Sequence, residues 1–377
     1  MLAVQAGPAP ALAPGPEPMS GDGMWIWQMN RSSRGNLAAI GRRAVSRGID
    51  MVVIKAADGT RAWRQFTPQV VSTLKSYGLR VCGYQFIYGR RPRTEARVGA
   101  GVVARGAGCL LLDAEGTYEG RYAQAQTYLR SLRARIGPSY PVGLASFPYV
   151  SFHPAFPYSV FLGPGGAQFN VPQMYWRAIG VSVDRIYSVT YRYNRPYQRP
   201  IYPLGQVWMH PPASHIRRFR QLAVAYGARG VSWWDWQESG ARDWRAVAMP
   251  FSPLLRYLPA QGYAGLRRGW RGDLVVWAQE HLRAAGQQIP ITGYFRSGTL
   301  AAVLSFQAAH GLPPTGRIDS ATWDALLRYP PTPVRWRGGR ASVVAASARA
   351  SSSARSGPPS ARLGAVRDEL GSRGRRR

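Results

Sequence analysis

The chain has 377 residues, of which 45% are hydrophobic, so it is long enough for two domains and apolar enough for a large core. No stretch approaches the roughly 20 apolar residues that a transmembrane helix needs. The formal net charge of +31 favours polyanions such as nucleic acid, acidic lipid headgroups or an anionic cell wall, but no recognition-helix, RNA-binding or zinc pattern accompanies it.

The first 23 residues are rich in proline and alanine, and we expect them to form a disordered leader. They lack a basic n-region and are therefore not a complete signal peptide. Because Ala11-Leu12-Ala13 resembles a cleavage site, the leader is either the remnant of an export signal or the disordered start of a cytoplasmic protein.

Residues 24–249 alternate short apolar runs with stretches of helical spacing, several of which end in glycine as a helix C-terminus should. The predicted strands are 24–29, 51–56, 80–86, 109–115, 141–146, 171–176, 203–209 and 230–236. Eight strands that alternate with helices indicate a parallel sheet, and continuous apolar strands indicate burial on both faces. The sequence therefore predicts an α/β fold of the (β/α)8 barrel type, with a doubly wound open sheet as the alternative.

After a linker at 250–265, residues 266–329 show a second pattern, that of a small all-α unit with three helices. LVVWAQEHLRAAG and LAAVLSFQAAHG each place apolar residues on one face, and ATWDALLR follows as a short third helix. A unit of this size has little room for a pocket and is normally a binding module. Residues 330–377 carry eleven arginines and few large apolar residues, which predicts a disordered tail with weak affinity for anions.

The run CLLLDAEG ends a predicted barrel strand with two carboxylates, Asp113 and Glu115. Residues two apart on a strand face the same side, about 6.6 Å apart at ~3.3 Å per residue. Two such carboxyls can divide the work of glycoside cleavage, and burial would favour the protonated form of one of them. The alternative is that they cap the helix predicted from residue 118.

Other polar and aromatic residues lie near strand ends, where the active sites of barrels are built. Such a cleft, with aromatic platforms and polar edges, suits a glycan, although about half of the aromatic residues are expected to fill the core. The candidate substrate-binding residues are Lys55, Asp58, Tyr84, Gln85, Gln173, Tyr175, Trp234 and Asp235.

The two cysteines, Cys82 and Cys109, lie in apolar runs, where two buried thiols are favoured over a bridge. The five histidines are scattered, and His210 and His215 make no metal-ligand cluster. We therefore expect no metal site and no cofactor.

VIKAADGT at 53–60, CGYQF at 82–86 and LLLDAEG at 110–116 each stand at the end of a predicted strand. In order and spacing they resemble three strand ends of glycoside hydrolase family 25, the cell-wall lysozymes. The resemblance implies that Glu115 is the general acid and that Asp113 positions the acetamido group of the substrate or stabilises developing charge. Asp58 stands where the family has Glu, and Gly23 falls where the family's first strand carries Asp.

The second domain resembles the peptidoglycan-binding three-helix domain over most of its motif. The matching parts are the start of its first helix, the GYFRSGT turn, the AVLSFQ helix and the GLPPTGRIDSATWDALL ending. Arg296 is a departure, because the family usually has Gly after the Phe. Together the two resemblances imply a monomeric protein of the cell wall or extracellular space that binds peptidoglycan. Its barrel would cleave β-1,4 glycosidic bonds, or bind glycan without cutting it. A cytoplasmic location and a basic nucleic-acid binder are the alternatives.

Overall fold

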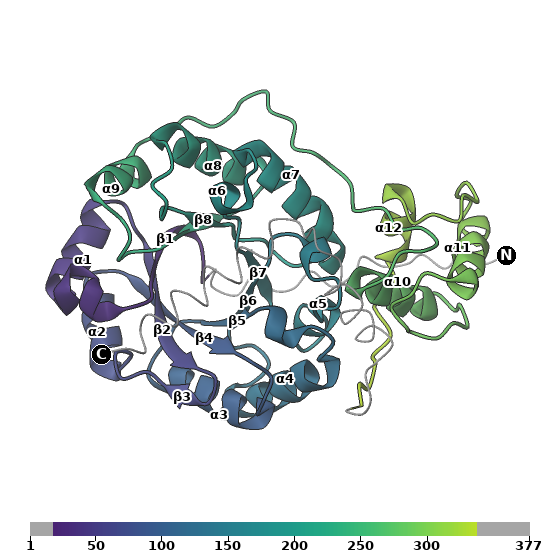
Figure 1. Cartoon of the computed structure of the whole chain (residues 1–377), viewed down its shortest axis with the longest axis horizontal. Coiled ribbons are helices and arrows are strands. Elements are labelled where there is room, and N and C mark those ends of the chain that lie inside the picture. The colour runs from purple at the N-terminus through teal and green to yellow at the C-terminus, as the bar shows by residue number, and fades with distance from the viewer. Residues whose placement is uncertain (1–17, 338–377) are drawn as a thin grey trace, which may run out of the picture.

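The computed structural model describes residues 18–337 and shows a parallel barrel with a small helical unit beside it (Figure 1). The barrel strands follow the order β7-β6-β5-β4-β2-β1-β9-β8, and bridges from Asn170 to Ile201 and from Gln173 to Leu204 bring β8 back to β7. The predicted fold class, a (β/α)8-type barrel with a C-terminal helical unit, is confirmed.

Each barrel strand overlaps one predicted apolar run, although β1 begins three residues and β7 two residues earlier than predicted. The strands are β1 (Gly21–Ile26), β2 (Met51–Asp58), β4 (Arg80–Ile87), β5 (Leu110–Ala114), β6 (Val142–Ser146), β7 (Phe169–Pro172), β8 (Leu204–Gln206) and β9 (Gly230–Trp234). The short β3 (Arg61–Ala62) folds back antiparallel on the end of β2. This hairpin extends the wall of the barrel at the carboxyl end of β2.

Helices surround the barrel on its outer side (Figure 1). They are α1 (Leu37–Ser46), α2 (Pro68–Ser76), α3 (Pro92–Ala104), α4 (Tyr122–Ile136), α5 (Tyr158–Phe161), α6 (Trp176–Ile179), α7 (Val183–Asn194), α8 (Ala213–Ala225) and α9 (Ala241–Ala248). Local sequence fixes several starts: Asn36 caps α1, Thr67 caps α2 before Pro68, and Ser182 caps α7.

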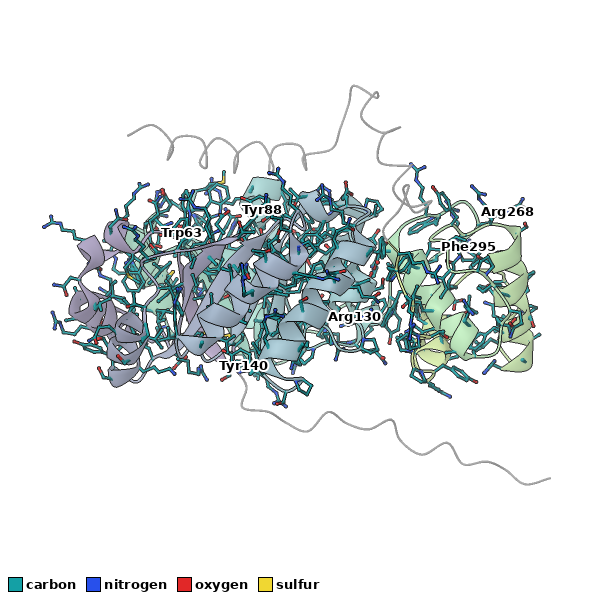
Figure 2. The ribbon with its side chains drawn as sticks, turned by 90° about the horizontal axis from the view of Figure 1, so that it is seen from below. Trp63, Tyr88, Arg130, Tyr140, Arg268 and Phe295 are labelled. Carbon is teal, nitrogen blue, oxygen red and sulfur yellow. A yellow bond between two sulfur atoms is a disulfide. The ribbon has the colours of Figure 1, made fainter. Side chains whose placement is uncertain are left out.

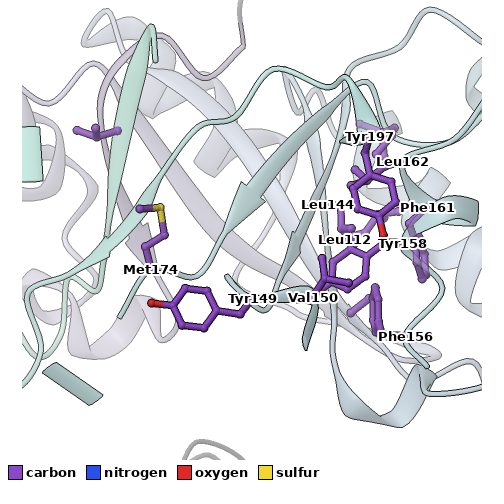
Figure 3. Close-up of a cluster of buried hydrophobic side chains, with 14 of the residues drawn as sticks. Leu112, Leu144, Tyr149, Val150, Phe156, Tyr158, Phe161, Leu162, Met174 and Tyr197 are labelled. Carbon is purple, nitrogen blue, oxygen red and sulfur yellow. The ribbon is translucent and has the colours of Figure 1, made fainter. Parts of the chain in front are cut away.

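Strand alternation divides the apolar residues between two cores. Leu110 and Leu112 pack outward against the helices, whereas Leu111 points into the barrel. The outer core includes the aromatic cluster of Tyr158, Phe161 and Tyr197 (Figure 3). Because inward and outward positions alternate, Asp113 and Glu115 continue the inward line of Leu111 towards the mouth of the barrel.

The two cysteines form a disulfide, which corrects the expectation of two buried thiols. Gly83 pairs with Leu110 across β4 and β5, so Cys82 and Cys109, the residues just before them, are direct neighbours. Their Cα atoms lie 4.7 Å apart, within bonding reach, and both side chains are buried in the barrel interior. The apolar pattern of each single strand does not predict the register between β4 and β5, on which this bridge depends.

The C-terminal unit is built from α10 (Asp273–Ala284), α11 (Ser297–Ala309) and α12 (Ser320–Leu326). Two buried glutamines organise its turns in the same way. The Gln279 oxygen accepts from the backbone of Thr292 and Gly293, and its amide donates to Thr299. Gln307 repeats this with Gly316 and Thr322, so the unit contains the same turn twice.

The C-terminal unit docks on the barrel through the start of α10, near α5 (Figure 1). The buried carboxylate of Asp273 accepts from the Ser159 amide at 2.8 Å, the Ser159 hydroxyl at 2.7 Å and the Tyr197 hydroxyl at 2.7 Å. The Trp277 indole donates to the Pro196 carbonyl at 2.7 Å. These bonds are buried, so they fix the unit against the barrel wall.

Two predicted boundaries differ from the structure. Strand β1 begins at Gly21, inside the predicted leader, and Met19 is already buried, while residues 1–17 lie outside the described part. In the predicted tail, the ring centre of Trp336 lies 4.4 Å from that of Tyr122 on α4, with the two rings tilted by 39°, and Gln126 donates to the Val334 carbonyl. The remainder of that tail, 338–377, lies outside the described residues. Within 18–337, none of the helices has the length and apolar character needed to cross a membrane.

Candidate active site at the carboxyl face of the barrel

Asp113 and Glu115 lie together at the carboxyl end of β5. The side-chain amide of Gln173, just beyond β7, donates to Asp113 Oδ1 at 3.2 Å and to Glu115 Oε1 at 3.0 Å. Asp113 is buried, whereas Glu115 is half-buried and closer to solvent. One amide group therefore holds both carboxylates on the same side of the barrel mouth, with Glu115 nearer to an incoming ligand.

Helix capping does not account for this pair. Glu115 precedes the short 3-10 helix η3 (Gly116–Tyr118), but its side chain makes no capping bond there. The next α-helix, α4, starts at Tyr122 after Arg121 and also lacks a side-chain cap. The carboxylates are thus held by Gln173 across the barrel and not by the backbone of the helix that follows them.

Tyr175 contributes a buried hydroxyl to the same region. Burial raises the pKa of Tyr175 well above its usual value, and the charges of Asp113 and Asp235 act in the same direction. Its hydroxyl has no hydrogen-bond partner among residues 18–337. Since buried polar atoms in folded proteins are nearly always paired, this hydroxyl is available to a ligand that enters the mouth.

Asp235 follows β9 directly, after a cis peptide bond from Trp234, and is buried. Burial and, to a smaller extent, the neighbouring Glu238 raise the pKa of Asp235 to about 8. The Gln237 amide donates to one carboxyl oxygen, while Oδ1 has no partner among the described residues. Asp235 is therefore suited to hold a proton near neutral pH and to donate it in a hydrogen bond.

Lys55 and Asp58 form an ion pair at the end of β2, with Lys55 Nζ 3.1 Å from Asp58 Oδ2. Lys55 is buried, and its ammonium lies 5.1 Å from the ring centre of Tyr84 and 5.4 Å from that of Trp63. The Tyr88 hydroxyl donates to Asp58 Oδ1 at 2.8 Å. This pair forms a charged, aromatic-lined wall of the mouth.

The aromatic candidates line the upper interior of the barrel. Trp25, Tyr84 and Trp234 pack against one another with ring centres 4.9 to 6.1 Å apart. Trp25 is buried and its indole donates to Ser232, which makes it a core residue, whereas Trp234 is half-buried. Of these three rings, only that of Trp234 is partly open to solvent.

Gln85 is the one candidate that the structure does not bring to the mouth. Strand alternation turns it outward, because its neighbour Tyr84 faces the interior. Its amide donates to the carbonyls of Gly59 and Glu95, and its oxygen accepts from Tyr128 on α4. Gln85 therefore ties the sheet to the helices and is no longer a candidate for substrate contact.

The first strand supplies no acid to the mouth. Gly23 faces inward near Met51 and Ser232, while Asp22 points away and pairs with Arg220 at 2.8 Å. Burial raises the pKa of Asp22, and the ion pair with Arg220 opposes that effect. The structure therefore has no carboxylate from β1 at the position where the family 25 pattern would place its first-strand Asp.

Sequence reasoning missed the residues contributed by loops. Trp63 and Tyr88 lie on one rim of the barrel, opposite Tyr140 (Figure 2). The buried Glu95 holds the loop before α3, since its carboxylate accepts from four successive backbone amides, those of residues 88–91. The signal for Trp63 and Tyr88 that the sequence offered was an aromatic residue just past a strand end.

Among the described residues, no cluster of His, Cys, Asp or Glu could hold a metal ion.

Comparison with known proteins identifies the C-terminal unit. Residues 271–326 match the family model described as "Putative peptidoglycan binding domain". A comparison with curated proteins finds no match. Among solved structures, the chain is similar to a peptidoglycan-binding protein from Clostridioides difficile in complex with glutamine hydroxamate, at 40% identity over 18% of this chain, with a TM-score of 0.17. This chain covers 44% of that protein, less than half of its length.

Two further solved structures are similar over the barrel. The Bacillus cereus spore cortex-lytic enzyme SleL shares 11% identity over 62% of this chain and 75% of its own, with a TM-score of 0.46. A chitinase from Chromobacterium violaceum shares 12% identity over 60% of this chain and 98% of its own, with a TM-score of 0.42. The resemblance of the barrel to family 25 stays a prediction. The chain thus joins a barrel of the (β/α)8 type to a domain of the peptidoglycan-binding type.

Proposed function

We propose that this protein binds peptidoglycan through its C-terminal domain and hydrolyses the β-1,4 glycosidic bonds of the glycan at the barrel mouth, as a muramidase does. The observation that carries the proposal is the Asp113–Glu115 pair, held by Gln173 at the carboxyl face of a barrel in a chain with a peptidoglycan-binding domain. Active sites of such barrels are built at this face.

In this mechanism Glu115 is the general acid, because it is the more exposed of the two carboxyls. Its proton passes to the glycosidic oxygen as the bond from the anomeric carbon to that oxygen breaks. The carbonyl oxygen of the substrate's acetamido group attacks the anomeric carbon, with Asp113 orienting the group and stabilising its positive charge. Water then attacks the same carbon and returns a proton to Glu115, which restores the enzyme and the acetamido group.

The buried polar atoms around the pair fit this scheme. Among residues 18–337 the Tyr175 hydroxyl and Asp235 Oδ1 have no hydrogen-bond partner, so both are available to hydrogen-bond the sugar that is cleaved. Asp235, with its pKa raised to about 8, would donate while protonated. Lys55 and Asp58 would hold the rim of the site, and Trp234 would offer an apolar face to the ring.

We further propose that the protein acts as a monomer in the cell wall or extracellular space. The Cys82–Cys109 disulfide supports this place of action, since disulfides persist in oxidising compartments. The high positive charge supports attraction to an anionic wall.

The second candidate function is peptidoglycan binding without cleavage. It is favoured by the first strand, where Asp22 is engaged by Arg220 and Gly23 offers no carboxylate. In that case the mouth would still bind glycan through its aromatic and polar side chains.

Incubation of the full-length protein with purified, insoluble peptidoglycan separates the two candidates. Hydrolysis predicts new reducing ends and soluble muropeptides, and mass spectrometry of these products identifies the linkage that is cut. Cosedimentation without any release on walls of several chemical types would refute hydrolysis and support the second candidate.

A further inference from the structure

A pocket of about 470 Å³ lies on the barrel rim beside the candidate active site, between the segment after β1 and the hairpin after β2. Its volume is within the range of about 300–1,000 Å³ that is usual for small-molecule sites. The lining residues are Gln28, Met29, Asn30, Gly35, Trp63 and Gln65. None of the candidate residues named from the sequence for catalysis or substrate contact is among them.

The chemistry of this lining selects for a neutral polar ligand. Although the chain carries a net charge of +31, none of the six lining side chains is charged. Trp63 provides an aromatic surface, and Gln28 and Asn30 provide amides that both donate and accept hydrogen bonds. The nearby Arg31 guanidinium, which donates to Gln28 at 3.4 Å, is paired with Glu238 at 3.9 Å and does not itself line the pocket. The lining therefore favours a sugar ring, which has apolar faces for the tryptophan and hydroxyls for the amides, over an anionic polymer or a charged peptide.

The pocket is held in shape before any ligand arrives. The Gln65 amide donates to the carbonyls of Trp27 and Lys55 at 2.8 and 2.9 Å, and its oxygen accepts from the Met29 amide at 2.9 Å. One side chain therefore ties the end of β1 to β2 across the pocket. A preformed wall of this kind lowers the ordering cost of binding.

The backbone around the pocket is also unusual. Ser33 and Arg34 adopt left-handed conformations, with φ of 48° and 56°, directly before Gly35 at 74°. Two successive non-glycine residues in this region cost free energy, and such strain concentrates at ligand sites. This turn closes the pocket on the side of β1.

Trp63 connects the pocket to the candidate active site, because its ring also lies 5.4 Å from Lys55 Nζ in the wall of the mouth. In the sheet, β4 separates β2 from β5, which carries Asp113. Neighbouring strands lie about 4.8 Å apart, so β2 lies on the order of 10 Å from β5, and β1 lies about 15 Å from β5. A short oligosaccharide spans that distance.

We propose that this pocket is a second sugar subsite, which binds an uncharged N-acetylhexosamine ring away from the scissile bond. This role rests on the proposed glycan hydrolysis. Trp63 is the platform for the ring, and Gln28 and Asn30 hydrogen-bond its polar edge. The subsite would make the protein prefer long glycan strands to short ones.

Calorimetric titration of the full chain with N-acetylglucosamine oligomers, from the dimer to the hexamer, tests this subsite independently of cleavage. We expect the affinity of the wild type to rise with oligomer length, and Trp63→Ala to lower the hexamer affinity about 5- to 10-fold and so to remove most of the gain from dimer to hexamer. Trp63→Phe should retain most of the gain. Arg64→Ala, which removes an exposed side chain next to Trp63, is the control and should behave as wild type.

A hexamer affinity that is equal in the wild type and in Trp63→Ala would overturn the subsite, as would the absence of any gain with length in the wild type. A Trp63-dependent gain in a protein that releases nothing from walls would retain the subsite and overturn only the proposed hydrolysis. The two failures are therefore distinguishable.

Discussion

Replacing Cys82 and Cys109 together by alanine should lower the free energy of unfolding by about 3–5 kcal/mol. The two residues are 27 apart in sequence, and a bridge closing a loop of that length removes about 12 cal/mol/K of unfolded-state entropy, or about 3.5 kcal/mol at 25 °C. Both sulfurs lie in the barrel interior, so their removal also leaves a small cavity that costs about 1 kcal/mol more.

Urea denaturation, followed by tryptophan fluorescence, measures this difference from the transition midpoints of the oxidised wild type and the double variant. Thiol titration of the wild type in denaturant provides the control and should find no free thiol. Wild-type protein reduced before unfolding keeps both sulfur atoms, so it should lose only the loop-closure part, about 3.5 kcal/mol. The reasoning is refuted if the titration finds two thiols in protein purified from an oxidising compartment, or if the variant matches the oxidised wild type within about 0.5 kcal/mol.

Three further predictions concern the docked domain, the buried acid and the basic tail. Asp273→Ala leaves the Ser159 amide and the Tyr197 hydroxyl without their acceptor, so urea denaturation should show a loss of about 2–4 kcal/mol, and Asp273→Asn a smaller one. The pKa of Asp235 is raised to about 8, so its contribution to stability is complete below its unfolded pKa, near 4, and is lost as the pH rises towards 8. Between pH 6 and 8 the wild type should therefore lose up to about 1.4 kcal/mol per pH unit relative to Asp235→Asn. Removal of 338–377, with nine arginines against Asp368 and Glu369, should weaken cosedimentation with walls at low salt more than at high salt, since charges are screened over about 8 Å at physiological salt.

Each of these predictions has a contrary outcome. Equal stability of Asp273→Ala and wild type would show that the docking contact contributes nothing. Parallel stability curves for Asp235→Asn and wild type would mean that the carboxyl is not held protonated. A loss of wall binding that is independent of ionic strength would exclude a role for the charge of the tail.

Sequence periodicity was sufficient to predict the barrel strands and the three-helix unit, because both depend on local apolar spacing. The same spacing placed Asp113 and Glu115 on one inward line, since a strand repeats every two residues. It did not place Gln85, whose outward direction follows from the same alternation once Tyr84 is seen to face inward. Applying the alternation to both neighbours would have excluded it.

Features that depend on contacts between distant segments could not be read from the sequence. The Cys82–Cys109 bridge depends on the register of β4 against β5, and the contact of Trp336 with Tyr122 joins residues far apart in the chain. The pocket at Trp63 depends on how two loops meet above β1 and β2. Apolar patterns report which side of an element is buried but not which loop lies beside it.

The rate at which Glu115→Gln releases reducing ends from purified peptidoglycan tests the central claim most directly. Glutamine preserves the shape and a hydrogen bond to Gln173 but has no acidic proton, so the rate should fall by about 10²–10⁴-fold, while wall binding and melting temperature stay close to wild type. Glu119→Gln is the matched control, since Glu119 lies nearby but contacts His153 at 3.3 Å instead of the pair, and it should retain wild-type activity. A Glu115→Gln protein that cleaves walls as fast as the wild type would contradict the assignment of Glu115 as the general acid.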